Sequence, residues 1–134
     1  MKLITRDTDY ALRAVCFIVK NKKTVSVPEL VRELNIPRPF LRKILQVLSR
    51  KGIVRSFKGK GGGFTLGLPP EKIYLLDLLR IFQGPLKLNE CTLNKKRCPK
   101  ISNCPLSKKL SGIEKQVLRE LKPITIASLI KGMA

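Results

Sequence analysis

Apolar positions in the first half of the chain recur at helical spacing in three short segments. In residues 10–19 they fall at positions 11, 14, 15, 18 and 19, which form one face of a helix. The sequence S-V-P-E, beginning at Ser26, has the form of a capping box with proline in the first turn and predicts a second helix. A third helix is predicted after the turn at 35–37, with apolar positions 40, 41, 44, 45 and 48 on its buried side and Gly52 at its end. Two short helices joined by a tight turn predict a helix-turn-helix.

The pattern then changes from helical spacing to short extended segments. Residues 53–57 and 64–68 are predicted to be strands, joined by the glycine-rich turn 58–63. A helix-turn-helix followed by a β-hairpin is the element order of a winged helix. Two prolines at 69–70 interrupt the chain, and residues 75–83 predict a further short helix that ends at Gly84.

The last third of the chain combines an irregular segment with a long amphipathic helix. Residues 85–104 show no periodicity, and such long irregular segments in compact proteins usually have a function. Pro105 begins a helix that continues to about Leu121, and a final short helix is capped by Thr125. The apolar stripe of the long helix could pack on its own domain, but pairing with a second copy is favoured.

Net charge limits the choice of partners. There are 28 Lys and Arg residues against 9 Asp and Glu residues, giving a net charge of +19, which favours DNA, RNA or an anionic membrane surface as partner. No segment approaches the ~20 apolar residues of a membrane span, and charges at positions 6, 7, 9 and 13 argue against a signal peptide. We therefore expect a cytoplasmic protein, in which clustered cysteines bind metal or sense redox state instead of forming a disulfide scaffold.

Basic side chains on the third predicted helix are candidates for contact with DNA. Arg38 and Arg42 are four residues apart and share a face near the helix N-terminus, where helix-turn-helix proteins meet base edges. Arginine can form a bidentate contact with guanine. Lys43 and Arg50 are the other basic residues that this helix is expected to expose. The N-terminus of the preceding helix, at Ser26, can present backbone N–H groups to phosphate.

The hairpin turn F-K-G-K-G-G-G-F is a second candidate contact. Lys58 and Lys60 alternate with glycines, of which Gly61 follows Lys60. Glycine allows close approach of the backbone to a phosphate or into a narrow groove, and lysine supplies charge. The Walker pattern is absent and the turn joins two strands, which argues against nucleotide binding. A hairpin with solvated lysines is the structural alternative.

Three cysteines gather in the irregular segment with the spacing C-x6-C-x5-C, at Cys91, Cys98 and Cys104. Basic residues among them favour the thiolate form that binds metal, and three thiolates on one segment suit an iron–sulfur cluster. Zinc is less favoured because the C-x2-C pattern is absent. The chain contains no histidine, so a fourth ligand must be of another kind. A thiol redox switch and cysteines without any cofactor are the remaining alternatives. The lone Cys16 lies in an apolar helix face and is expected to be a core residue.

These features give three classes of function to compare. A regulator of transcription that depends on its cysteines is favoured. A thiol oxidoreductase is disfavoured because C-x-x-C, histidine and a catalytic carboxylate pair are missing, so we expect no enzyme activity. A basic scaffold that binds DNA without sensing would not respond to loss of the cysteines.

The chain resembles the Rrf2 family of bacterial winged-helix repressors over essentially its whole length. The resemblance rests on T-D-Y-A-L-R at 8–13, on the turn G-x-G-G-G-[FY] at 59–64, on the three-cysteine segment and on the closing P-I-T-I-A-S-L-I. It implies a homodimer with long crossed helices, a 2Fe–2S or 4Fe–4S cluster on the cysteines, and repression controlled by redox, nitric oxide or iron status. Several members have C-x5-C-x5-C, so this chain has one additional residue in the first gap.

The resemblance also bears on individual residues. IscR-like members use a histidine three residues after the last cysteine, where this chain has Ser107. NsrR-like members use an aspartate from the other subunit, and Asp9 occupies that position here. Asp9 is thus the implied fourth ligand, although an acidic residue near a helix N-terminus is also favoured by the helix dipole. The same resemblance implies base reading by Arg42 and a hairpin contact by Lys58.

We therefore expect a mainly α protein with a small β-hairpin, built as a winged helix-turn-helix with a long C-terminal dimerisation helix. Residues 1–84 would form the DNA-binding domain and 85–104 the cluster-binding segment. Residues 105–134 would form the dimerisation helix and the short final helix.

Overall fold

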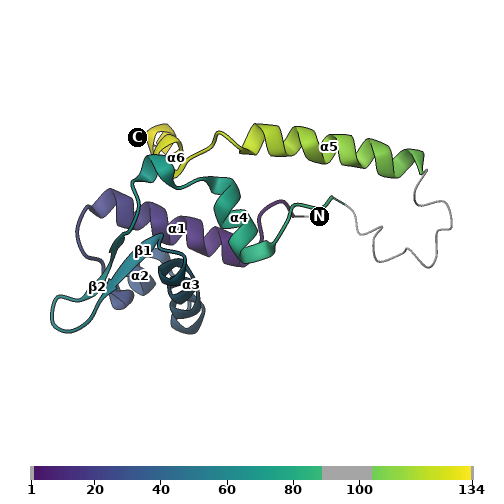
Figure 1. Ribbon diagram of the computed structural model, residues 1–134. Coiled ribbons are helices and arrows are strands. Elements are labelled where there is room, and N and C mark those ends of the chain that lie inside the picture. The colour runs from purple at the N-terminus through teal and green to yellow at the C-terminus, as the bar shows by residue number, and fades with distance from the viewer. Residues whose placement is uncertain (1, 89–103, 134) are drawn as a thin grey trace.

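The computed structural model describes residues 2–88 and 104–133. Its elements follow the predicted order of a helix-turn-helix, a hairpin and a long C-terminal helix (Figure 1). Along the chain they are α1 (Arg6–Asn21), α2 (Val27–Leu34), α3 (Arg38–Arg50), β1 (Val54–Phe57), β2 (Gly63–Leu66), the 3-10 turn η1 (Pro70–Lys72), α4 (Leu75–Gln83), α5 (Pro105–Leu121) and α6 (Ile126–Met133). The predicted fold class, a winged helix-turn-helix with a long C-terminal helix, is confirmed.

Helix boundaries follow local chemistry. The hydroxyl of Ser26 accepts a hydrogen bond from the Glu29 N–H at 3.2 Å, which confirms the predicted cap of α2. Asn35 ends α2 in the left-handed conformation with φ of 54°. Helix α1 begins at Arg6, earlier than the apolar pattern indicated, and carries Asp7 and Asp9 in its first turn. Acidic side chains are stabilised there by the helix dipole, a signal that apolar periodicity does not contain.

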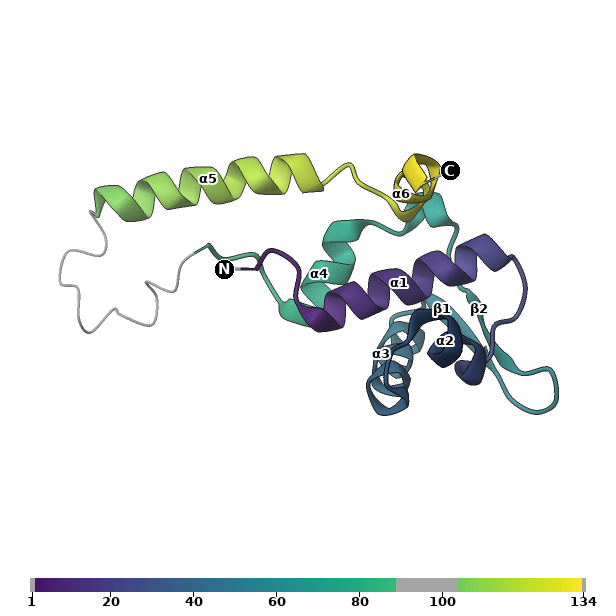
Figure 2. The same cartoon turned by 180° about the vertical axis from the view of Figure 1, so that it is seen from behind.

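One core joins α1, α2, α3, the hairpin, α4 and α6. Ala11 and Ala14 on α1 are fully buried, and α1 packs against both α3 and α4. Figure 2 shows α1 crossing the molecule, with α2 and α3 on one side and α6 on the other. The largest fully buried side chains of this core include Leu30, Ile36, Leu41, Leu45, Leu48, Leu78 and Ile126. The helices that carry the candidate DNA contacts therefore pack into one hydrophobic core.

The hairpin is fastened to the start of α2 as well as to α3. Strands β1 and β2 pair antiparallel, with Val54 opposite Leu66 and Phe57 opposite Gly63. Val25 forms an isolated antiparallel bridge with β2, because its N–H donates to the Phe64 carbonyl at 2.9 Å and its carbonyl accepts from the Phe64 N–H at 2.8 Å. Gly63 lies against this bridge with φ of 151°, and a β-carbon at Gly63 would meet the Val25 carbonyl oxygen.

Replacing Gly63 by alanine should displace the hairpin from α2. The strained φ alone is expected to cost roughly 1–3 kcal/mol, to which the collision with backbone adds. The measurement is the free energy of unfolding from denaturant titration followed by circular dichroism. The matched control is Gly112→Ala on α5, where an added β-carbon meets nothing within 4 Å and the helix should gain roughly 0.5–1 kcal/mol. Equal stability of Gly63→Ala and wild type would contradict the described bridge.

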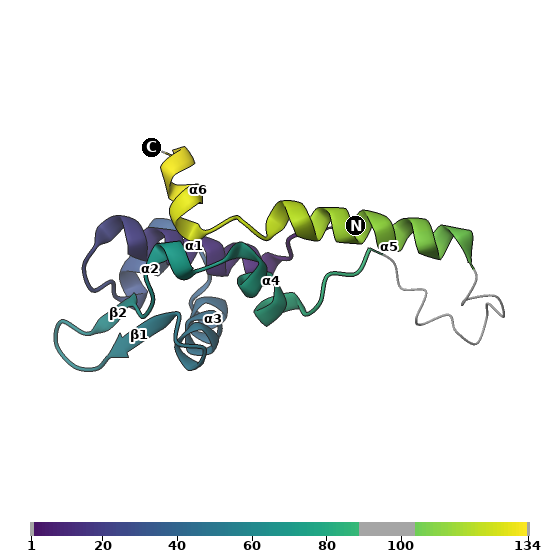
Figure 3. The same ribbon diagram turned by 45° about the horizontal axis from the view of Figure 1, so that its top comes forward.

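Helix α5 packs against α4 along only part of its length. Leu121 packs with Leu75, Leu76 and Leu79 of α4. Toward the other end Leu106 is 62% exposed and Ile113 is 48% exposed, although both belong to the apolar stripe. Figures 1 and 3 show α5 extending past α4 and away from the helix-turn-helix. Within residues 2–88 and 104–133, no helix is both long enough and apolar enough to cross a membrane.

Candidate nucleic-acid interface and metal centre

Helix α3 presents a row of polar side chains to solvent. Arg38 and Arg42 are both exposed and stand one turn apart, as the sequence predicted. Two further exposed residues, Gln46 and Arg50, continue this row at the same spacing of four. Lys43 is also exposed but lies on the flank of α3, where it lines a small hollow with residues of α1 and α4. The row of positions 38, 42, 46 and 50 is the face that α3 can insert into a groove.

A hollow of about 480 Å³ lies between this face and the hairpin. It is lined by Gln46, Ser49 and Arg50 of α3 and by Ser56 and Phe64 of the hairpin. These side chains offer a guanidinium group, an amide and two hydroxyls, all of which can donate hydrogen bonds to phosphate. None of these lining residues carries a carboxylate. We call this hollow the α3–hairpin notch.

The hairpin turn is exposed and basic. Lys58 and Lys60 are both exposed, and they are separated by Gly59 with φ of 90°. Gly61 has φ of 75°, and the Gly62 N–H donates to the Gly59 carbonyl at 2.9 Å. Left-handed φ values at two positions explain why this turn requires glycine. The two lysines therefore lie on a tight turn whose other residues are glycines without side chains.

Ser26 stands at the base of the hairpin. Its hydroxyl accepts from Glu29 within the α2 cap and can still donate one hydrogen bond. A β-carbon built on Gly63 would lie 3.1 Å from the Ser26 Cα, so the N-terminus of α2 adjoins the hairpin. The structure thus brings together Ser26 and the strand that follows the lysine turn, which are almost forty positions apart in the sequence.

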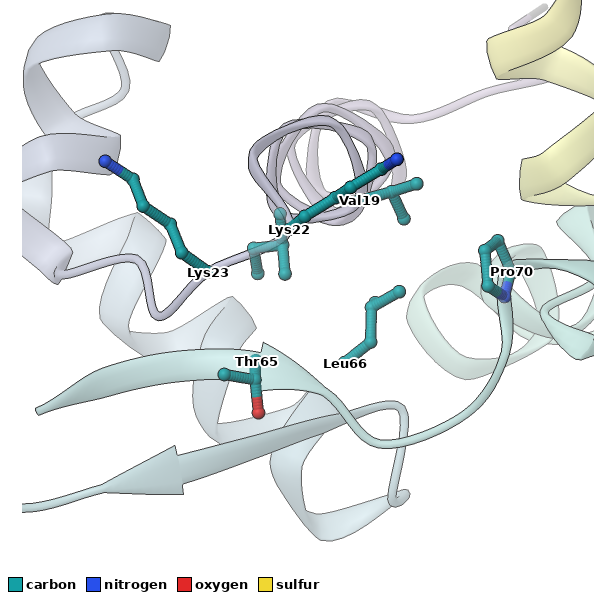
Figure 4. A pocket seen from close by; sticks show the side chains of 7 residues that line it. Val19, Lys22, Lys23, Thr65, Leu66 and Pro70 are labelled. Atoms are coloured by element: carbon teal, nitrogen blue, oxygen red, sulfur yellow. The ribbon is translucent and has the colours of Figure 1, made fainter.

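A second hollow lies on the other edge of the hairpin, between β2 and the end of α1. Its volume is about 320 Å³, and its walls are mainly apolar, with Val19, Leu66 and Pro70 among them (Figure 4). Lys22 and Lys23 stand at its rim and are exposed, and in Figure 4 Lys23 is directed away from the hollow. These lysines add positive charge beside the hairpin.

Of the four proposed metal ligands, the structure describes two. Cys104 is the N-cap residue of α5, is half-buried and makes no capping hydrogen bond through its sulfur. Asp9 on α1 forms an ion pair with Arg13 at 3.1 Å, and its side chain is 42% exposed. Cys91 and Cys98 lie outside the described residues. Among the residues that are described, no three His, Cys, Asp or Glu side chains come together as a metal site.

The arrangement of α1 and α5 bears on whether Asp9 and Cys104 of one copy could bind the same cluster. Helix α5 begins at its end remote from α1 (Figures 1 and 3). Within one copy, the first turn of α1 and the first residue of α5 are therefore apart.

Comparison with known proteins identifies the chain. The sequence profile of the Rrf2 family, described as iron-dependent transcriptional regulators, matches residues 4–132. The chain belongs to the Rrf2 family. An HTH-type transcriptional regulator of Aquifex aeolicus is 35% identical over 124 residues, covering 90% of this chain and 86% of that protein.

Two solved structures of Rrf2-like proteins share the fold. IscR of T. potens superposes with a TM-score of 0.78 at 21% identity, covering 100% of this chain and 89% of IscR. CymR, the global cysteine regulator of B. subtilis, superposes with a TM-score of 0.73 at 22% identity, covering 98% of each chain. As an Rrf2 protein this chain is a transcriptional regulator and not an enzyme, and the family implies that it binds DNA.

Cys16 stands apart from the other three cysteines of this Rrf2 chain. It is 8% exposed in the core, as its apolar neighbours predicted. Burial raises the pKa of the Cys16 thiol, and Lys20 offsets this pKa shift in part. The thiol is therefore neutral and inert near neutral pH. Cys91, Cys98 and Cys104 are therefore the candidates for metal binding or thiol oxidation.

Sequence reasoning missed Gln46 in the polar row of α3, although it counted Arg50 among the exposed basic residues of this helix. Gln46 and Arg50 are spaced four and eight residues after Arg42. Helical spacing alone would have placed them on the same face. Ser56 could not have been found in this way, because the fold brings β1 beside α3.

Proposed function

We propose that this protein is a homodimeric transcription regulator, a repressor in the expected case, whose affinity for operator DNA depends on the state of Cys91, Cys98 and Cys104. The observation that carries this proposal is the division of the cysteines. One of the four is an inert core residue, and the other three gather just before α5. Three cysteines clustered within fourteen residues of the sequence of a transcription regulator are best explained as its sensing group.

The DNA-binding face combines α3 and the hairpin. In the proposed complex α3 enters the major groove, with Arg42 positioned to read guanine and Arg38 one turn closer to the helix start. Lys58, Lys60 and Gly61 enter the adjacent minor groove, where narrow width favours basic side chains. Ser26 and Lys43 would contact the flanking sugar–phosphate backbone.

The α3–hairpin notch suits the DNA strand between the two grooves. A major and a minor groove are separated by one sugar–phosphate backbone, which must pass between α3 and the hairpin when each occupies its groove. Arg50, Ser49 and Ser56 line that passage with donors. Contacts with phosphate set affinity and register but carry no direct sequence information.

Arg50→Ala should weaken binding to operator and random DNA by the same factor. One lost phosphate contact reduces the slope of log K against log salt concentration by about 1. Fluorescence anisotropy titrations at several salt concentrations measure both quantities. Arg119→Ala, an exposed arginine on α5, is the control and should leave the slope unchanged. A loss confined to operator DNA would instead assign Arg50 to base reading.

An iron–sulfur cluster is the leading candidate for the sensing group. Thiolate sulfur is the usual ligand of such clusters, and the family is described as iron-dependent. Cys91, Cys98 and Cys104 would hold it, and Asp9 of a second copy would supply the fourth ligand after separating from Arg13. The free Cys104 sulfur and the partly exposed Asp9 carboxylate are compatible with these roles. Bound cluster would supply a group that iron, oxygen or nitric oxide can alter.

A thiol redox switch without a cluster is the second candidate. The structural similarity to CymR supports it, because CymR has the same fold and is described as a global cysteine regulator. In this case oxidation of Cys91, Cys98 or Cys104 would change DNA affinity directly.

Anaerobic purification separates the two candidates. A cluster predicts absorbance between about 300 and 500 nm and matching amounts of iron and sulfide. A colourless protein that cannot be reconstituted with iron and sulfide, but whose DNA affinity changes on oxidation, would support the thiol switch.

The homodimer is supported by the uncovered half of α5. Leu106 and Ile113 are exposed apolar residues on its stripe, and contact with the same stripe of a second copy would bury them. Two copies would also supply the two α3 helices that read two operator half-sites. Light scattering gives the mass in solution, for which twice the chain mass of 15.1 kDa is expected.

A further inference from the structure

The side chain of Gln83 fastens the last turn of α4 to the start of α1. Its Oε1 accepts hydrogen bonds from the Thr5 N–H at 3.0 Å and from the Thr8 hydroxyl at 2.7 Å. A longer bond of 3.2 Å comes from the Thr5 hydroxyl. Its Nε2 donates to the Leu3 carbonyl at 2.8 Å. Both the oxygen and the nitrogen of the Gln83 amide thus form hydrogen bonds with residues 75 to 80 positions earlier in the sequence.

The partners of Gln83 require an amide at this position. Leu3 offers a carbonyl and needs a donor, whereas the Thr5 N–H needs an acceptor. Thr8 is fully buried, and its other hydrogen-bond partner is the Thr5 hydroxyl at 3.2 Å. Glutamate would keep the acceptor but place a carboxylate oxygen against the Leu3 carbonyl, and leucine would offer neither group.

The residues that Gln83 holds are next to two functional positions. Arg6 follows Thr5 and stacks on the Phe40 ring of α3, with its guanidinium carbon 4.6 Å from the ring centre. Asp9 follows Thr8, and its backbone N–H donates to the Thr5 carbonyl at 2.9 Å. The start of α1 therefore contacts α3 through Arg6 and carries the proposed fourth ligand.

Gln83 is also close in sequence to the cysteine segment. Gly84 follows it with φ of 75°, and five residues after Gln83 the Leu88 N–H donates to the Glu114 carboxylate of α5 at 2.6 Å. The chain between Gln83 and Leu88 is thus fixed at both ends, to α1 at one and to α5 at the other. A shift of α5 relative to α4 would act on Gln83 through this short connection.

We propose that Gln83 is the positioning residue that couples the state of the cysteines to the orientation of α3. The coupling runs from α5 through Glu114 and Leu88 to Gln83, then through Thr5 and Thr8 to the first turn of α1, and through Arg6 to Phe40. It rests on the proposed function, because it requires that the cysteines control DNA affinity. A hydrogen-bonded contact that is either formed or broken gives the two discrete arrangements that such coupling needs.

The test compares DNA affinity in two cysteine states for wild type and Gln83→Leu. One state is reduced protein with a chelator, and the other is the same protein after anaerobic incubation with iron and sulfide, or after mild oxidation if no cluster forms. For wild type we expect the two dissociation constants on one operator fragment to differ by roughly 5- to 150-fold. In Gln83→Leu this ratio should fall to within about twofold of one. Iron and sulfide content should stay as in wild type.

Two further variants make the result specific. Gln116→Leu changes an exposed glutamine on α5 and should keep the wild-type ratio. Thr8→Val combined with Gln83→Leu removes both partners of the buried hydrogen bond, which preserves folding better than removing one. Circular dichroism should show that this double variant is folded. Its two dissociation constants should differ as little as those of Gln83→Leu.

The outcomes separate this proposal from the one on which it rests. A wild-type ratio in folded Gln83→Leu and in the double variant overturns the role of Gln83 and leaves the sensing cysteines in place. A ratio of one in wild type, in every cysteine state, overturns both. If the wild-type dissociation constant changes on oxidation but not with iron and sulfide, only the proposal of a cluster is overturned. The role of Gln83 is then tested by comparing the dissociation constants of reduced and oxidised protein.

Discussion

Replacing Cys91, Cys98 and Cys104 together by alanine should abolish the response of DNA binding to iron, sulfide and oxidants. The three sulfur atoms are the donors of the proposed sensing group, so the variant should contain no iron or sulfide. It should bind operator DNA in every condition with the affinity of metal-free, reduced wild type. Dissociation constants from fluorescence anisotropy, measured with and without iron and sulfide, test this expectation.

Cys16→Ala is the matched control for the triple variant. It removes one thiol as well, but from the core, where the side chain is 8% exposed. The loss of a buried sulfur atom lowers stability through the cavity that it leaves, and the response to iron and sulfide should persist. A triple variant that still responds would show that the sensing group lies elsewhere in the chain.

Arg42→Ala should remove most of the preference for operator over random DNA. A bidentate contact between arginine and guanine contributes about 1–3 kcal/mol of discrimination, which is roughly 5- to 150-fold in the ratio of dissociation constants. Binding to random DNA should fall much less, because other cationic side chains on the hairpin and α3 remain. The measurement is the dissociation constant for operator and for random duplexes of equal length, at one salt concentration.

Two substitutions sharpen the assignment of Arg42. Arg42→Lys keeps the charge but loses the planar pair of donors, so random-DNA affinity should be retained while discrimination falls. Arg119→Ala on α5 should change neither quantity. Equal loss of operator and random binding in Arg42→Ala would mean that this arginine contacts phosphate and that another side chain reads the bases.

Local signals in the sequence were sufficient to predict most elements. Helix α4 was predicted at residues 75–83, and it spans Leu75–Gln83, because prolines at 69–70 and a glycine at 84 bound the apolar pattern on both sides. The Ser26 cap and the Thr125 cap were likewise predicted, and the Ser128 N–H donates to the Thr125 hydroxyl at 3.1 Å. Such signals depend on neighbours within four residues and need no tertiary contact.

Strand boundaries differed by one or two residues for a physical reason. The first strand was expected at 53–57 and begins at Val54, and the second was expected at 64–68 and ends at Leu66. Gly67 leaves the strand ladder, although its N–H still donates to the Ile53 carbonyl at 2.8 Å. A β-carbon at Gly67 would collide with the Gly52 carbonyl oxygen, so this end of the hairpin is set by contact between two distant glycines.

Long-range polar contacts were the features that sequence could not predict. The bridge between Val25 and Phe64 and the network around Gln83 join segments about 40 and 80 positions apart. Nothing in the local pattern around a glutamine at a helix end distinguishes a solvated side chain from one that fastens two helices. The candidate DNA face, in contrast, depends mainly on one helix and one turn, so spacing along the chain was sufficient to find most of it.

The most direct test of the central claim is one titration performed on one preparation. Protein purified without oxygen is divided, and half is stripped with a chelator under reducing conditions. Both halves are titrated against the same labelled operator fragment at the same salt concentration. We expect dissociation constants that differ by roughly 5- to 150-fold and converge when iron and sulfide are restored to the stripped half. Identical constants for both halves, with no further change on thiol oxidation, would contradict control of DNA binding by the cysteines.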